Sequence, residues 1–156
     1  MRKIKEINKV LPAPNKIRVS DVIAIPLNHT YWAYARICKT PSMAILDVVS
    51  NEQKVLCNII KANTKVVFYI EFYEPYDVSP WVYLGKWKFE NEDESWGPPV
   101  FIKDIIDPKR YRILHRGKMT NCTEDQVKGL NPHGLMAPEG IKRKIMLEFK
   151  TFRMID

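Results

Sequence analysis

The sequence predicts an α+β fold that is mainly antiparallel β: a bent sheet or partly open barrel with a short central helix and a C-terminal helix. Three observations support this prediction. Most apolar runs are short and alternate with polar residues, as in strands that bury one face. Only two segments show the four-residue apolar spacing of an amphipathic helix. The 156 residues, of which 46% are hydrophobic, suffice for one domain around one core.

Residues 1–16 are expected to form a flexible basic arm ahead of a single domain over residues 17–156. Pro12 and Pro14 in this arm interrupt regular structure. The segment is charged and lacks the apolar stretch of a secretory signal, so no signal peptide is expected.

The domain is predicted to begin with a meander of three strands. The first covers residues 22–27, where Pro26 indicates an edge strand or a bulged strand end. Asn-His-Thr at 28–30 forms the turn, and residues 31–39 alternate as the second strand. Residues 43–49 are the third strand, and the tight connections make the three a meander.

The apolar spacing then changes to that of a helix over residues 51–61. Ser50 is its expected N-cap, with Gln53 completing a capping box. Alternation returns at residues 65–73 and 82–89, which predicts two more strands. Gly85 in the second of these indicates a bulge or a close approach of another chain segment.

Shorter strands are predicted in the last third of the chain, at residues 100–102, 111–115 and 118–122. Thr123 is expected to cap a helical turn that ends at Val127. Residues 137–150 are predicted to form the terminal helix, with Pro138 in its first turn.

Composition favours a protein of the cytoplasm. Cys38, Cys57 and Cys122 are odd in number and far apart, which indicates buried free thiols in a reducing compartment rather than disulfides or a zinc site. No apolar run approaches the roughly 18 residues of a membrane-spanning helix.

No motif for catalysis or cofactor binding is present, so neither an enzyme nor a cofactor is expected. The chain lacks GxSxG, HExxH, Walker A and GxGxxG patterns. His29, His115 and His133 have no metal-ligand spacing, so no metal site is expected. An alternative is a metal-independent nuclease in which His29 or His115 meets a distant histidine as general acid and base.

The net charge of +7 is unevenly distributed. Residues 71–96 hold seven acids and two Lys, whereas residues 103–118 hold six Lys or Arg and two Asp. The basic segment supports an alternative function, a nucleic-acid-binding β-barrel that contacts its ligand through Arg110, Tyr111, Arg112 and Arg116. No RNA-binding motif accompanies it.

The acidic segment contains a candidate surface for binding a partner protein. Glu90, Glu92, Asp93 and Glu94 lie next to Trp96 and the stiff Gly97-Pro98-Pro99. Trp81 and Trp96 flank predicted loops, where large aromatic residues often anchor interfaces. The alternative for each is a solvated loop or ordinary packing.

Several stretches together resemble a known family. They are DVIAIPL, YWAYARI, MAILDVV, WVYLGKW, PPVFIKD and YRILHRG. This pattern, from Ile17 to Lys118, is similar to the immunity protein 26 family of bacterial polymorphic-toxin and contact-dependent growth inhibition systems. The best-matching positions are Asp21, Ile25, Pro26, Tyr34, Arg36, Gly85, Pro98, Pro99 and Phe101. The chain departs from the family at Ser20, where Gly is usual, and at residues 29–31, where Gly-Arg-Tyr is usual.

The resemblance implies a cytosolic antitoxin without enzymatic activity, which binds the C-terminal domain of one cognate toxin. This agrees with a compact β-rich domain that has charged and aromatic loops and no catalytic motif. The expected contacts are Glu90, Glu92, Asp93, Glu94, Trp96 and Trp81, with the segment around Arg110 as the alternative contact surface.

Overall fold

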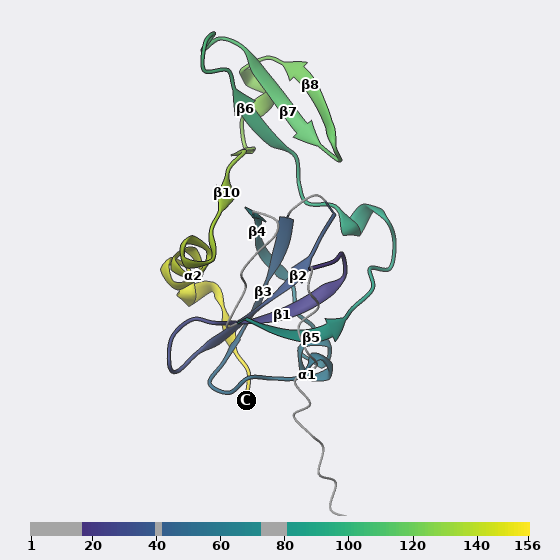
Figure 1. Cartoon of the computed structure of the whole chain (residues 1–156), viewed down its shortest axis with the longest axis vertical. Coiled ribbons are helices and arrows are strands. Elements are labelled where there is room, and N and C mark those ends of the chain that lie inside the picture. Colours follow the sequence, from purple (N-terminus) through teal and green to yellow (C-terminus); the bar gives the residue numbers. More distant parts are fainter. Residues whose placement is uncertain (1–16, 40–41, 73–80) are drawn as a thin grey trace, which may run out of the picture.

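The structure, a computed structural model, describes residues 17–39, 42–72 and 81–156 (Figure 1). The predicted basic arm, residues 1–16, lies outside the described residues. The predicted fold class is confirmed: most strand pairs are antiparallel, the sheets do not close into a barrel, and there is one central and one C-terminal helix. None of the helices in the described ranges is long and apolar enough to span a membrane.

The larger sheet has seven strands, and the main path runs in the order β10-β4-β3-β2-β1-β5, with β11 beside β3. These strands are β1 (Asp21–Pro26), β2 (Trp32–Ile37), β3 (Ser42–Ser50), β4 (Val66–Phe72), β5 (Val82–Lys86), β10 (Leu135–Met136) and β11 (Arg153–Met154). The predicted meander is therefore confirmed as β1, β2 and β3. Its first turn is held by Asn28, whose Oδ1 accepts the backbone N–H groups of Thr30 (2.7 Å) and Tyr31 (2.8 Å).

The smaller sheet has four strands in the order β8-β7-β6-β9 and stands away from the larger one (Figure 1). Its strands are β6 (Val100–Lys103), β7 (Tyr111–His115), β8 (Lys118–Cys122) and β9 (Asn131–Pro132). The predicted strands at 100–102, 111–115 and 118–122 are thus confirmed. Whether residues 17–156 form one domain, as predicted, stays a prediction.

Two α-helices cover opposite faces of the larger sheet. The alternation of β2 explains this, because Ala33 and Ala35 face one side and Tyr34 the other. The first side packs against Ile141 and Ile145 of α2 (Pro138–Leu147), and the second against α1 (Leu56–Lys61). The described residues also form three 3-10 turns, η1 (Asp93–Ser95), η2 (Asp125–Val127) and η3 (Phe149–Thr151).

The prediction for the start of the central helix was wrong. Helix α1 begins at Leu56 after the N-cap Val55, not at residue 51. Ser50, the predicted N-cap, ends β3 instead. Its hydroxyl is hydrogen-bonded to the Tyr34 hydroxyl (2.5 Å) and donates to the Glu52 carbonyl (2.6 Å). The physical reason is that a buried tyrosine hydroxyl without a hydrogen-bond partner would be costly.

The end of β1 differs in part from the prediction. Pro26 does end the strand, but β1 is not an edge, since it pairs with both β2 and β5. Pro26 is tolerated there because the pairing with β5 stops at Ala24. The bulge expected near Gly85 is confirmed by a register shift between β1 and β5 opposite Val22 and Ile23.

Other element limits differ by a few residues. Strand β5 ends at Lys86 rather than at residue 89. Helix α2 ends at Leu147 rather than at residue 150, and η3 begins at Phe149. Thr123 does not cap η2 with its side chain; its backbone N–H instead donates to the side chain of Gln126 (2.9 Å).

The three cysteines are free, but they are not all buried as predicted. Cys38 is buried, Cys122 half-buried and Cys57 exposed on α1. Burial raises the pKa of the Cys38 thiol to about 11, so this thiol stays protonated and unreactive at neutral pH.

Candidate functional site

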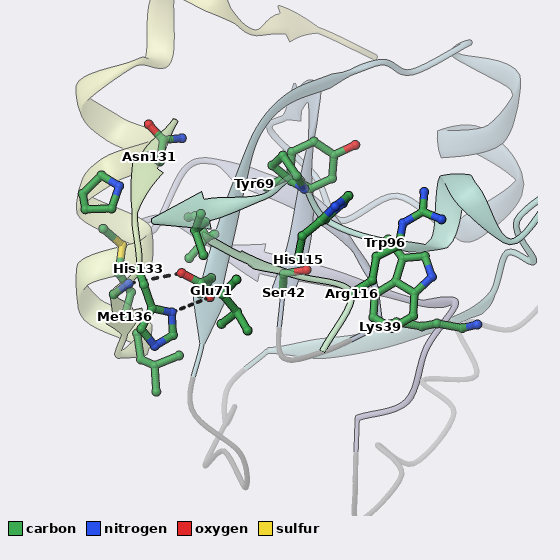
Figure 2. A pocket seen from close by; sticks show the side chains of 18 of the residues that line it. Lys39, Ser42, Tyr69, Glu71, Trp96, His115, Arg116, Asn131, His133 and Met136 are labelled. Carbon is green, nitrogen blue, oxygen red and sulfur yellow. Dashed lines mark hydrogen bonds and ion pairs between the residues drawn. The ribbon is translucent and has the colours of Figure 1, made fainter. Parts of the chain in front are cut away.

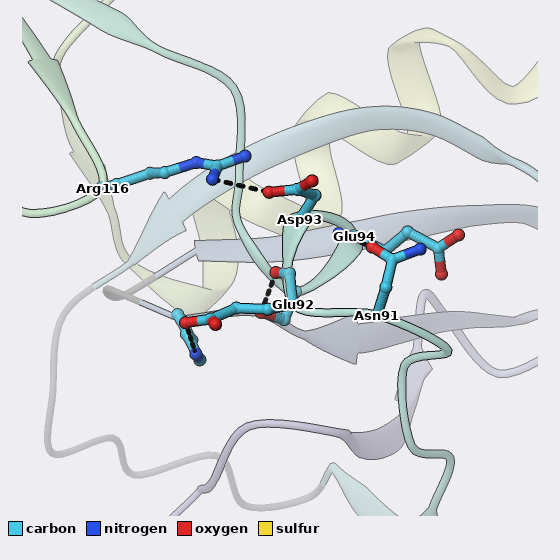
Figure 3. A network of polar contacts seen from close by, with 7 residues as sticks. Asn91, Glu92, Asp93, Glu94 and Arg116 are labelled. Carbon is cyan, nitrogen blue, oxygen red and sulfur yellow. Dashed lines mark hydrogen bonds and ion pairs between the residues drawn. The ribbon is translucent and has the colours of Figure 1, made fainter.

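The acidic loop is held in place by cations of its own chain (Figure 3). The carboxylate of Glu92 lies 2.9 Å from Lys39 Nζ, and that of Asp93 lies 2.7 Å from Arg116 Nη1. Two of the four predicted contact carboxylates therefore already have a counter-charge. A partner that binds them must first compete with these exposed ion pairs, each of which contributes little to stability.

Backbone contacts fix the position of this loop beside the end of β2. The N–H of Lys39 donates to the carbonyl of Ser95 (2.7 Å), and the buried Ser95 hydroxyl donates to the carbonyl of Glu92 (2.5 Å). Trp96 follows, half-buried, with Lys39 Nζ 5.3 Å from the centre of its ring. Trp96 thus keeps some exposed surface, as a contact residue needs.

Glu90 and Glu94 differ from the other two acids because the described residues offer them no ion pair. They lie in the field of Arg36, whose guanidinium stacks 4.2 Å from the Trp87 ring centre and 3.8 Å from that of Phe89. Burial lowers the pKa of Arg36, and the negative charges of Glu94 and Glu90 oppose this effect. These two carboxylates are the ones in the loop that remain open to a partner.

The prediction that Trp81 anchors a partner is wrong. The side chain is only 5% exposed and packs in the main core cluster with Ile23, Phe72 and Ile145. Its position just before β5 brings the indole over the face covered by α2, where burial of a large apolar ring is more favourable than exposure.

The predicted basic contact residues have different environments. Arg110 and Arg116 are exposed, whereas Tyr111 is 8% exposed and its ring lies 6.3 Å from that of Phe101. Arg112 directs one guanidinium nitrogen at the sulfur of Met119 (3.2 Å). A buried tyrosine presents no face to a base, so Tyr111 is not the stacking residue that the nucleic-acid alternative assumed.

A candidate contact surface that was not among the predicted site residues lies between β6 and β7. Ile105 and Ile106 are 99% and 94% exposed at the tip of this hairpin. The tip is farther from the larger sheet than the rest of the smaller sheet (Figure 1). The signal in the sequence is the pair of adjacent isoleucines in Asp-Ile-Ile-Asp-Pro, because a turn between two strands is normally polar.

The isoleucine tip has a fixed backbone. Asp104 Oδ1 accepts the N–H groups of Ile106 (2.8 Å) and Asp107 (3.1 Å), and the backbone N–H of Asp104 donates to the carbonyl of Arg110 (2.9 Å). The hydrogen bonds from Asp107 and Ile106 lower the pKa of Asp104. These hydrogen bonds favour one conformation of the turn, which would reduce the entropy lost on binding a partner.

A cleft of about 400 Å³ lies between the smaller sheet and the β4 edge of the larger one (Figure 2). His115 and His133 both line it, whereas His29 is exposed in the first turn and does not. Glu71 accepts from His133 Nδ1 (2.8 Å) and from the backbone N–H of Gly134 (3.1 Å), which ties the segment between β9 and β10 to β4. No group of three metal-ligating side chains occurs within the described ranges.

Comparison of the chain with models of protein families, with curated proteins and with solved structures gives no match.

Proposed function

We propose that the protein is a cytosolic immunity protein, which binds and neutralises a cognate toxin domain without catalysing a reaction. The resemblance to the immunity protein 26 family motivates this function. The single structural observation that carries it is the isoleucine tip, which exposes two large apolar side chains on a rigid support.

Such a tip has the properties of an interface anchor. Energetically dominant contacts are large side chains that enter a pocket of the partner and lose all contact with water there. Adjacent exposed apolar side chains form an apolar patch, and such patches on soluble proteins often mark interaction sites. Ile105 and Ile106 would enter such a pocket together.

The charges around the tip indicate the charge expected on the partner's contact surface. Residues 103–112 carry Lys103, Lys109, Arg110 and Arg112 against Asp104 and Asp107, a balance of four positive and two negative charges. Both Asp side chains are also engaged by backbone N–H groups of the turn. The toxin surface would therefore be an apolar socket with an acidic rim, which speeds encounter and excludes other toxins.

The acidic loop is the second contact in this proposal. Glu90, Glu94 and Trp96 are its available members, because Glu92 and Asp93 are paired within the chain. Changing Glu90, Glu92 and Glu94 to Gln and Asp93 to Asn is expected to weaken toxin binding while the protein stays folded. Unchanged affinity would restrict the interface to the smaller sheet.

Co-expression tests the proposal directly. The protein is produced together with the toxin encoded immediately upstream, and cell survival and co-purification are measured. Protection by a one-to-one complex is expected. If none of the neighbouring toxins is bound or neutralised, the proposal is wrong; retention of nucleic acid that falls steeply with salt would instead favour the nucleic-acid alternative.

A further inference from the structure

The cleft between the two sheets has the size and lining of a small-molecule site. Its volume, about 400 Å³, lies within the range of ligand pockets. Its wall is mainly apolar, with Val100 and Leu114 from the smaller sheet and Leu135 and Met136 from the returning segment. Trp96 lies at one end and His133 at the other (Figure 2). A ligand with an apolar body is the kind that such walls favour.

The charged groups of the cleft favour an anion. Three cations line it, Lys39, Arg116 and Lys144, against one carboxylate, that of Glu71. Glu71 is already satisfied by His133 and Gly134. Both of its oxygens therefore already accept hydrogen bonds within the chain, and the three cations outnumber this one carboxylate in the cleft.

The three cations are not equivalent. Lys39 and Arg116 are paired with Glu92 and Asp93 of the acidic loop. Lys144, on α2, has no carboxylate partner within the described ranges, and its Nζ lies 4.8 Å from the centre of the Phe68 ring. An ammonium group beside apolar walls and without a counter-ion binds an anionic group more strongly than one in open solvent.

We propose that this cleft binds a small organic anion with a flat apolar body, whose acidic group pairs with Lys144. The body lies between Leu114 and the segment from β9 to β10. The site is separate from the isoleucine tip but shares Trp96 with the acidic loop of the proposed toxin contact. The test below uses no toxin, so its outcome does not depend on the toxin partner.

Titration with 8-anilinonaphthalene-1-sulfonate, a fluorescent aromatic anion, tests the proposal. The expected result is one dye molecule per chain, measured by fluorescence and calorimetry on the full chain. Lys144→Gln is expected to weaken binding about tenfold, as loss of one charge-assisted contact does. Lys150→Gln is the matched control, since Lys150 is exposed just beyond α2 and does not line the cleft. The neutral analogue N-phenyl-1-naphthylamine should bind the Lys144→Gln protein as it binds the unchanged one.

A second variant fills the cleft. Leu114→Trp is expected to abolish dye binding, and Asn131→Trp, at an exposed cleft position, serves if the first variant does not fold. Thermal unfolding checks each protein. The proposal is overturned if Lys144→Gln binds the dye as tightly as the unchanged protein, if a folded Trp variant keeps full binding, or if several dye molecules bind per chain.

Discussion

Replacing both tip isoleucines by serine should weaken toxin binding while leaving stability almost unchanged. Ile105 and Ile106 are 99% and 94% exposed, so unfolding exposes almost no additional surface of either side chain. The Ile105→Ser/Ile106→Ser protein should therefore differ from the unchanged one by less than about 0.5 kcal/mol in the free energy of unfolding.

The effect on toxin binding should be much larger. Burial of one isoleucine side chain contributes about 1.5–3 kcal/mol, and the serines contribute none of it. Taking the lower figure for each residue, the loss is about 3 kcal/mol, which raises the dissociation constant by about 100-fold.

Calorimetry with the purified toxin domain measures this constant, and urea denaturation measures the stability. Leu147→Ser is the matched control, because Leu147 is an 81% exposed apolar residue on α2 and does not belong to the smaller sheet. The reasoning is refuted if the double variant binds the toxin as tightly as the unchanged protein, or if Leu147→Ser has the same effect.

Three further predictions concern the framework that positions these surfaces. Gly97→Ala should lower the free energy of unfolding, measured by urea titration, by about 1–3 kcal/mol, because the added Cβ would lie 2.7 Å from Ser42 Oγ. Combining it with Ser42→Ala should restore part of the lost stability. Tyr34→Phe should cost about 1–3 kcal/mol in the same assay, since its buried hydroxyl accepts the Lys54 N–H at 2.8 Å. Burial by itself raises the pKa of Asp47. Hydrogen bonds, chiefly from Arg153, lower this pKa by more than burial raises it, so the pKa of Asp47 lies below its ordinary value of 3.8. Asp47→Asn should therefore reduce stability at neutral pH, and the difference should vanish as pH falls through this lowered pKa, where Asp47 itself becomes neutral; a difference that persists in acid would contradict this assignment.

Much of the fold follows from local pattern. The alternation in β2 assigns Ala33 and Tyr34 to opposite faces, and the apolar spacing of α2 places Ile141 and Ile145 on the sheet. These assignments depend on the period of a strand or helix and on the apolar character of single residues, which a sequence states directly. The tight turn at Asn28 is of the same kind, because its hydrogen bonds join residues two and three positions apart.

Properties that depend on contacts between residues distant in the chain could be determined only from the tertiary structure. Ser50 and Gln53 have the spacing of a capping box, yet the Ser50 hydroxyl is hydrogen-bonded to the hydroxyl of Tyr34, sixteen positions away. Trp81 and Ile105 both border predicted loops, but one is buried and the other is 99% exposed. The acidic loop meets its cations across 53 and 23 positions, at Lys39 and Arg116. Sequence spacing states which residues are neighbours along one element, whereas burial and charge pairing depend on which elements the fold brings together, and the sheet order decides that.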